Sequence, residues 1–113
     1  SMTDLQKASD YIKTQLGNQH TVITLSEKGL FFDSGDQSTI IPTQARQIAD
    51  VCGAGDTVIS IVALGLAAAL DMPLIANLAN LAGGQVCEKV GVVPVDKLQL
   101  QEEYETLLEK NLE

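Results

Sequence analysis

The chain has few aromatic residues, few basic residues and no tryptophan. Its 113 residues include only two Tyr and two Phe, and seven basic residues stand against fifteen acidic ones, which gives a net charge of −8. Because an acidic surface repels phosphate backbones and anionic headgroups, this composition argues against a general nucleic-acid-binding or membrane-surface protein. An anionic ligand would therefore have to be held by local main-chain amides.

Cysteine is also scarce, and no apolar run is long enough to span a bilayer. Cys52 and Cys87 are far apart and form no Cys-x-x-Cys pair, so neither a zinc site nor a disulfide framework is indicated, and free thiols of a cytoplasmic protein are expected. The longest apolar run, Val58 to Leu70, is apolar nearly all round and is predicted to be a buried helix. Repeats, low-complexity stretches and internal linkers are absent. One domain over residues 3–113 is expected, with Ser1-Met2 as a remnant of expression cloning.

The first part of the chain predicts one helix and three strands. Thr3 to Leu16 carries a single apolar helical stripe, and Gly17 is placed to end it. Thr21 to Leu25 and Gly29 to Asp33 are predicted to be consecutive strands joined by a tight turn, and Ser38 to Ile41 is predicted to continue the meander. A small sheet with packed helices, in the α/β class, is therefore expected.

The second part predicts two further helices after the apolar run. Pro73 suits the first turn of a helix that runs from about Leu74 to Lys89, and a last helix begins near Val95. The helix from Leu74 has an expected core stripe and a second stripe of small or amide-bearing residues, which is either a close helix contact or one wall of a ligand pocket. The core stripe is Leu74, Leu78, Leu81 and Ala82; the second stripe is Asn77, Asn80, Gly83 and Gly84; the last helix is expected to expose Glu102, Glu103 and Glu105.

The most informative segment is Asp50 to Thr57, with the sequence Asp-Val-Cys-Gly-Ala-Gly-Asp-Thr, which leads directly into the apolar run. Small residues followed by Asp56 at a helix start place unpaired N–H groups and the positive end of a helix dipole beside a carboxylate. An ordinary capped turn is the plain alternative. The segment lacks the Gly-Lys-Ser/Thr of a P-loop and the third glycine of a dinucleotide fingerprint, which argues against a Rossmann-type oxidoreductase.

The whole eight-residue string at the start of an apolar helix resembles the signature of the ribokinase-like (PfkB-type) carbohydrate kinases. Two further segments resemble that family: Thr24 to Gly29, its strand-turn-strand under the nucleotide phosphates, and Asn80 to Gly91, its helix and loop beside the adenine and a monovalent cation. Within the family, the chain looks most like the kinase part of bacterial heptose-phosphate kinases, which act in ADP-heptose synthesis for lipopolysaccharide. Because such kinases are about the size of two average domains, the resemblance implies a partial ribokinase-like fold, the nucleotide-side half only.

The resemblance also implies roles for individual residues. Asp56 would be the base that takes the proton of the acceptor hydroxyl, and the amides of Gly53, Ala54 and Gly55 would form the anion hole. The remaining positions that match the family are Thr24, Gly29 and Asn80 for the nucleotide, and Asp50 with the carbonyls of Cys52 and Gly91 for a monovalent cation such as K⁺.

Some residues depart from the family pattern or carry a plainer interpretation. Ser26 stands where relatives often have Gly, Cys52 replaces a more usual Ser or Thr, and Val92 stands where Thr or Ala is common. These departures put nucleotide affinity and cation dependence in doubt, while the base is unaffected. Residues expected to be solvated or structural are His20, Lys28 and Lys89, and a satisfied helix-surface amide is as good an interpretation of Asn80 as a nucleotide contact.

The resemblance implies ATP and Mg²⁺ as cofactors and a sugar or sugar phosphate as substrate of the intact enzyme. Because the sugar-recognition segments of the family have no counterpart in this chain, the fragment is expected to be inactive alone. The resemblance also implies that the outer edge of the strand from Val22 to Leu25 and the apolar face of a buried helix are bare, so the fragment is expected to self-associate. The alternative is a non-catalytic nucleotide-binding or interaction module derived from the same fold.

Overall fold

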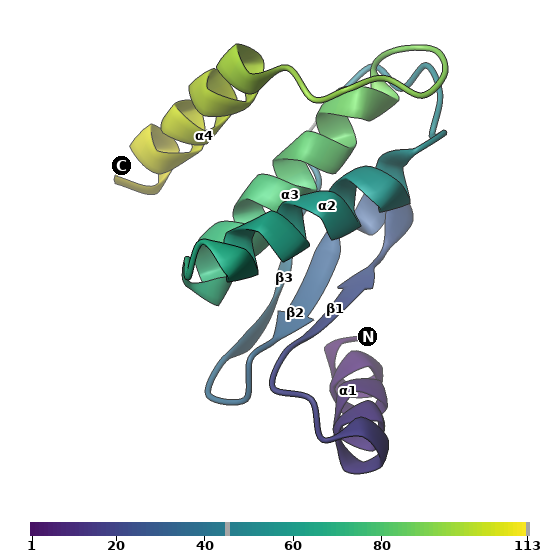
Figure 1. The fold of residues 1–113 in the computed structure, drawn as a ribbon, viewed down its shortest axis with the longest axis vertical. Helices are drawn as coiled ribbons and strands as arrows, with labels where there is room; N and C mark the ends of the chain where they lie inside the picture. Colours follow the sequence, from purple (N-terminus) through teal and green to yellow (C-terminus); the bar gives the residue numbers. More distant parts are fainter. Residues whose placement is uncertain (45, 113) are drawn as a thin grey trace. The chain divides into compact units, whose positions relative to one another are not determined.

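The structure is a computed structural model that describes residues 1–44 and 46–112. It divides into two compact units, Ser1–Pro42 and Thr43–Glu113. The first unit holds one helix and a three-stranded sheet, and the second holds three helices (Figure 1). The α/β class and the small sheet with packed helices are as the sequence predicts.

The first unit begins with helix α1, Met2–Leu16. Ser1 caps it by accepting a hydrogen bond from the amide of Asp4, and Gly17 ends it in the left-handed conformation at φ 65°, with its amide bonded to the carbonyl of Lys13. The predicted helix and its glycine stop are confirmed, and the helix includes Met2.

The sheet of the first unit is an antiparallel meander. Strands β1 (Thr21–Thr24), β2 (Leu30–Asp33) and β3 (Ser38–Ile41) pair in the order β1-β2-β3, with Thr21 opposite Asp33 and Leu30 opposite Ile41. A short 3-10 turn, Ser26–Lys28, joins the first two strands. All three strands are as the sequence predicts. Within the described part of the chain, β1 has no strand partner on its outer edge.

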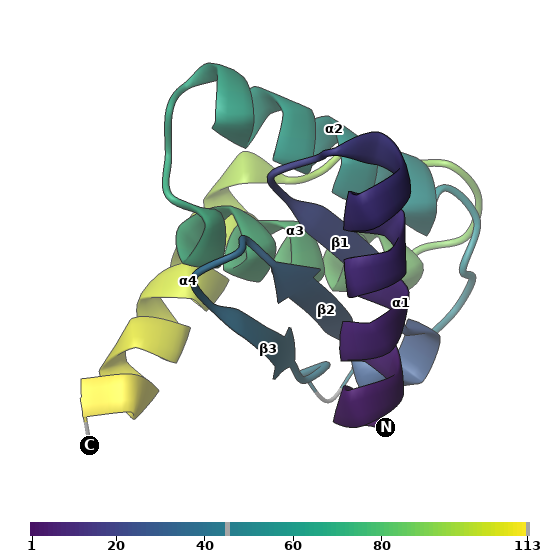
Figure 2. The same ribbon diagram turned by 90° about the horizontal axis from the view of Figure 1, so that it is seen from below.

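Helix α1 packs against β2 and β3 (Figure 2). Hydrogen bonds from α1 to one buried carboxylate of β2 fix this contact. Asp33 accepts from the hydroxyl of Ser9 at 2.7 Å, from the amide nitrogen of the Gln6 side chain at 3.0 Å and from the main-chain amide of Gly35 at 2.9 Å. The hydrogen bond from Ser9, helped by those from Gly35 and Gln6, holds the pKa of Asp33 below its usual value despite burial.

The second unit contains α2 (Ala54–Ala67), α3 (Met72–Cys87) and α4 (Lys97–Leu112). Asp71 caps α3 by accepting from the amide of Leu74, and Pro73 lies in the first turn, as predicted. Helices α2 and α3 lie side by side, and α4 packs against α3 (Figure 1). None of the helices in the described residues is both long enough and apolar enough to cross a membrane.

Glycines permit the close approach of α2 and α3. A Cβ atom on Gly65 would lie 2.6 Å from Cγ1 of Ile75, and one on Gly83 would lie 2.9 Å from Cγ2 of Val58. The sequence allows two interpretations of the stripe of small residues on α3: a close helix contact or a wall of a ligand pocket. For Gly83 the structure shows the helix contact.

Two expectations about burial are wrong. The apolar run was expected to form a buried helix, but α2 buries only Val58 and Gly65, and Ile59 and Leu64 are each 68% exposed. The α3 core stripe also differs from the expected one, because Leu74 and Leu78 are only half-buried. The apolar side chains that α3 buries fully are Ile75, Ala76, Ala79, Ala82 and Val86, and the polar one is Gln85. Because α2 and α3 lie close together, the small side chains of alanine are enough to fill the core between them.

Candidate functional site

The segment from Gly53 to Thr57 is the turn that opens α2. Gly53 is the N-cap residue, with the left-handed φ of 79°, and α2 begins at Ala54, so Asp56 lies within its first turn. The amide of Thr57 donates to the carbonyl of Gly53 at 3.0 Å, and the amide of Ala54 makes a long bond of 3.4 Å to the carbonyl of Val51. Within residues 1–44 and 46–112, the amides of Gly53, Gly55 and Asp56 have no acceptor.

These amides and the Asp56 carboxylate form a compact polar site. A helix N-terminus carries a partial positive charge, and unpaired amides there bind anions. Asp56 is exposed, and no basic side chain of the described residues lies within ion-pair distance of it. The turn therefore offers donors for negative charge next to an accessible, unpaired carboxylate.

A clasp made by Asp50 joins this turn to the loop after α3. One carboxylate oxygen accepts from the amide of Cys52 at 3.0 Å and the other accepts from the amide of Gly91 at 2.9 Å. The hydrogen bond from Gly91, followed by that from Cys52, lowers the pKa of Asp50. The structure thus brings together Asp50, Cys52 and Gly91, the three residues predicted to surround a cation.

The two cysteines belong to the same neighbourhood. The carbonyl of Cys87 accepts from the amides of Ala49 and Asp50, at 2.8 and 3.1 Å, only a few residues before Cys52. Both thiols are free; Cys52 is exposed, whereas Cys87 is buried, and its burial raises its pKa. The main chain at Cys87 therefore lies against the segment just before Cys52.

Thr24 and Gly29 share the turn of the first unit. The amide of Leu25 donates to the carbonyl of Gly29 at 2.9 Å, and Gly29 has φ 104°. A Cβ on Gly29 would overlap the carbonyl oxygen of Ile41, so no other residue fits there. Ser26 also has a positive φ, 56°, which gives a physical reason for the glycine that the resembled family often has at this position.

The other residues singled out in the sequence are placed as follows. Asn80 is half-buried on α3. Asn77 donates from its side chain to the carbonyl of Pro73 within the same helix. Exposed residues, in agreement with their expected solvated character, are His20, Lys28 and Lys89.

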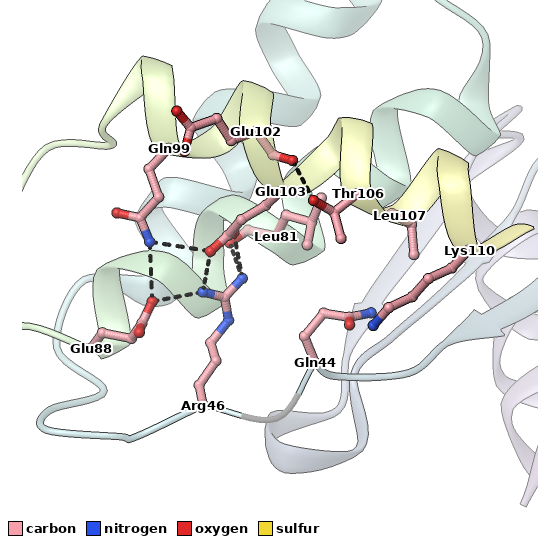
Figure 3. Close-up of a pocket in the computed structure, with 10 residues that line it drawn as sticks. All are labelled: Gln44, Arg46, Leu81, Glu88, Gln99, Glu102, Glu103, Thr106, Leu107 and Lys110. Atoms are coloured by element: carbon pink, nitrogen blue, oxygen red, sulfur yellow. Dashed lines mark hydrogen bonds and ion pairs between the residues drawn. The ribbon is translucent and has the colours of Figure 1, made fainter.

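Sequence reasoning missed Arg46, which is the centre of an ion-pair network in the second unit (Figure 3). Its guanidinium forms ion pairs with two carboxylates: Glu88, just after α3, at 2.7 Å, and Glu103 of α4, at 2.7 and 3.0 Å. It also donates a hydrogen bond of 3.2 Å to the carbonyl of Leu81. Gln99 donates to both carboxylates. The expected exposure of Glu103 is therefore wrong. The signal available in the sequence was that Arg46 is its only arginine, among fifteen acidic residues.

The charges in this network stabilise one another. Burial alone would lower the pKa of Arg46, but the hydrogen bonds and charges of Glu103 and Glu88 outweigh it and leave that pKa raised. Burial likewise opposes the charge of Glu103, yet hydrogen bonds from Arg46 and Gln99 bring its pKa below the usual value.

A cavity of about 420 Å³ lies beside the network, between Gln44 and Arg46 on one side and α4 on the other (Figure 3). The carboxylates of Glu88 and Glu103 and the guanidinium of Arg46 face one another there and are already paired. The other lining residues are Gln44, Leu81, Gln99, Glu102, Thr106, Leu107 and Lys110.

A divalent metal site made by the protein alone is not found in the described residues, because no three His, Cys, Asp or Glu side chains cluster there. The Asp50 clasp uses main-chain amides as its partners, and it holds two loops whose carbonyls remain available.

Comparison of the sequence with known proteins gives a consistent result. Residues 1–98 match the family model described as pfkB family carbohydrate kinase. The chain is 43% identical over 100 residues to the bifunctional protein HldE of Koribacter versatilis, and 41% identical over 97 residues to that of Trichlorobacter lovleyi. These alignments cover 88% and 85% of this chain but only 21% and 20% of the relatives, so the chain spans about a fifth of their length.

Solved structures show the same fold. The Escherichia coli phosphofructokinase-2 in complex with potassium is similar with a TM-score of 0.83 at 19% identity, over 92% of this chain and 34% of that one. A putative sugar kinase from Clostridium perfringens gives 0.83 at 23% identity, over 92% and 33%. The chain therefore has part of a ribokinase-like fold and belongs to the pfkB family of carbohydrate kinases.

Proposed function

We propose that this chain is the nucleotide-side part of a kinase that transfers the γ-phosphoryl group of ATP to a hydroxyl of a sugar or sugar phosphate, with a heptose phosphate as substrate. The observation that carries the proposal is the turn at the start of α2. Its unpaired amides at Gly53, Gly55 and Asp56 and its exposed carboxylate provide the two functions that such a transfer requires.

The roles follow from the chemistry. In the transition state of phosphoryl transfer, charge spreads over the oxygens of the transferred group, and fixed main-chain donors at a helix N-terminus stabilise that charge without reorganising. Asp56, in the same turn, accepts the proton of the attacking hydroxyl. Gly53 matters because the helix start needs a residue with a left-handed φ, which glycine adopts without strain.

The other matched residues have supporting roles in this proposal. Thr24 and Gly29 contact the phosphate side of the nucleotide, and Asn80 contacts the adenine. Mg²⁺ is carried by the phosphates of ATP, since the described residues offer no acidic cluster for it. A monovalent cation such as K⁺ is held by the carbonyls of Cys52 and Gly91, whose loops the Asp50 clasp joins.

The substrate class follows from the resemblance of the sequence to heptose-phosphate kinases, which the high identity to proteins named bifunctional protein HldE supports. Because the chain spans about a fifth of those relatives, the acceptor is positioned by other parts of the intact enzyme, and this chain alone lacks activity.

The test uses the intact protein that contains this segment. Titration with a non-hydrolysable ATP analogue and Mg²⁺ should show saturable binding, and phosphorylation should be seen with a heptose phosphate, while ribose and fructose 6-phosphate serve as comparison acceptors. Absence of nucleotide binding at millimolar concentration would refute the kinase and favour a non-catalytic module. Binding with transfer to another sugar would correct only the acceptor.

A further inference from the structure

The segment that leads into the α2 turn is anchored at three successive points. Arg46 is ion-paired with Glu88 and Glu103, the amides of Ala49 and Asp50 bond to the carbonyl of Cys87, and the Asp50 carboxylate bonds to the amide of Gly91. All the partners lie at the end of α3, just after it, or on α4. The path of the main chain into Gly53 is therefore set by how this segment lies against the end of α3.

Arg46 is buried in a way that stability alone does not explain. Its side chain is only 5% exposed, and a buried ion pair is often no more stabilising than apolar residues of similar volume. The structure nevertheless makes room for it, because a Cβ on Gly84 would lie 2.5 Å from Nε of Arg46. A glycine in the last turn of α3, a carboxylate just after α3 and a carboxylate on α4 thus contact one guanidinium group.

We propose that Arg46 is a positioning residue for the phosphate-binding turn. The planar guanidinium engages Glu103 with both terminal nitrogens and Glu88 with one of them, which fixes the direction as well as the position of the segment. Through Ala49 and Asp50 this orientation sets the amides of Gly53 to Asp56. The effect on nucleotide rests on the function proposed above; the effect on the segment does not.

The role of α4 follows from the same contacts. The family match ends at residue 98, and Glu103 lies beyond it on α4. Helix α4 therefore influences the turn at the start of α2 indirectly, because Glu103 of α4 forms an ion pair with Arg46. Removal of Glu103 would leave a buried guanidinium with only Glu88 and one carbonyl as partners.

The test separates positioning from stabilisation by using a double variant of the intact protein. Arg46→Met alone leaves the half-buried carboxylates of Glu103 and Glu88 without their ion-pair partner and should lower Tm. Arg46→Met/Glu103→Leu replaces the more buried pair with apolar side chains, leaves Glu88 with its hydrogen bond from Gln99, and should restore Tm close to that of the wild type. Lys110→Met/Glu102→Leu is the matched control, since both residues line the same cavity outside the ion pairs.

Amide hydrogen exchange and kcat/KM are then compared between the wild type, the control and the Arg46→Met/Glu103→Leu variant, whose stability is restored. Amide hydrogen exchange of peptides that cover residues 47–57 should be faster by about tenfold in the Arg46→Met/Glu103→Leu variant than in the wild type and the control. The kcat/KM for ATP should fall by about ten- to a hundredfold, as expected when reacting groups are misplaced by a fraction of a bond length to one ångström.

Wild-type exchange rates in the double variant would overturn the inference. Faster exchange with a wild-type kcat/KM would overturn it as well, because the segment would then move without any effect on the phosphate-binding turn. If the wild-type protein binds no nucleotide, the proposed function fails, and the exchange rates of residues 47–57 still decide whether Arg46 positions the segment.

Discussion

At the scale of single residues, Asp56 bears the chemistry of the proposed reaction. Its side chain is exposed and makes no hydrogen bond or ion pair among the described residues, so Asp56→Asn should leave the fold intact. The amide cannot accept the proton, and kcat of the intact enzyme should fall by about two to four orders of magnitude. The affinity for a non-hydrolysable ATP analogue is the control and should change little. A near-normal kcat of the Asn variant would show that Asp56 is not the catalytic base.

Asp33 makes stability depend on pH in a defined direction. Its pKa is lowered in the folded state, chiefly by the hydrogen bond from Ser9, so it stabilises the fold above its unfolded pKa of about 3.9 and this contribution is lost as pH falls through the lower folded pKa. Asp33→Asn should therefore lower Tm at pH 7, and the difference in Tm from the wild type should narrow below about pH 4. A Tm difference that is constant from pH 7 to pH 2 would contradict this account.

Two glycines with positive φ are expected to differ in their tolerance of alanine. Gly29→Ala should destabilise the fold by about 3 kcal/mol or more, because its Cβ would overlap the carbonyl of Ile41. Gly17→Ala is the matched control: it has φ 65° but nothing within 4 Å of its Cβ, so only the left-handed penalty of about 1–2 kcal/mol applies. Chemical denaturation would measure both, and equal losses would show that the overlap is relieved by movement of β3.

At the scale of elements, the sequence predicts nearly all the helices and strands, because their signals are local. The stop at Gly17 and the first-turn Pro73 act within a few residues of where they stand, and the structure has both. The turn at Gly53 is also local, which is why the candidate site could be placed from the signature alone.

Features that depend on distant partners could not be predicted. The burial of Glu103 requires Arg46, which lies 57 residues away, and no periodicity links the two. The exposure of Ile59 on α2 has the same origin, because an apolar helix shows that a partner is needed but not that the partner is within this chain. Glycine at position 83 was ambiguous until its neighbour Val58 was known.

The α2–α3 contact allows a test of close packing between elements. Gly83→Ala should gain up to about 1 kcal/mol in helix propensity, but the new methyl group would meet Val58, and overpacking costs about 1–3 kcal/mol. A net loss of stability is expected. In Gly83→Ala/Val58→Ala the clash is absent, so a double-mutant cycle in urea should give a favourable coupling energy. Additive effects would mean that the two helices separate freely.

At the scale of the whole molecule, the chain exposes surfaces that usually have partners. Side chains of Ile59 and Leu64 on α2 are largely exposed, and β1 has no strand partner on its outer edge among the described residues. Unpaired strand edges and contiguous apolar surface favour association. The 113-residue chain should therefore form a symmetric dimer.

Light scattering across a concentration series measures this association, and Ile59→Lys/Leu64→Lys should shift the chain to monomer if the α2 surface is buried in the dimer. A wild-type chain that stays strictly monomeric at high concentration would refute the prediction.

The Asp50 clasp also determines which substitutions are tolerated at positions 50, 52 and 91. Its two partners are the main-chain amides of Cys52 and Gly91, so the side chain at position 52 is not part of the hydrogen bond. Position 52 can therefore change among cysteine, serine and threonine without loss of the clasp, whereas position 50 needs two acceptor oxygens and position 91, with φ 82°, favours glycine. Saturation mutagenesis should accordingly find that position 52 tolerates substitution, whereas positions 50 and 91 do not. Of these two restricted positions, only position 50 is close to position 52 in sequence.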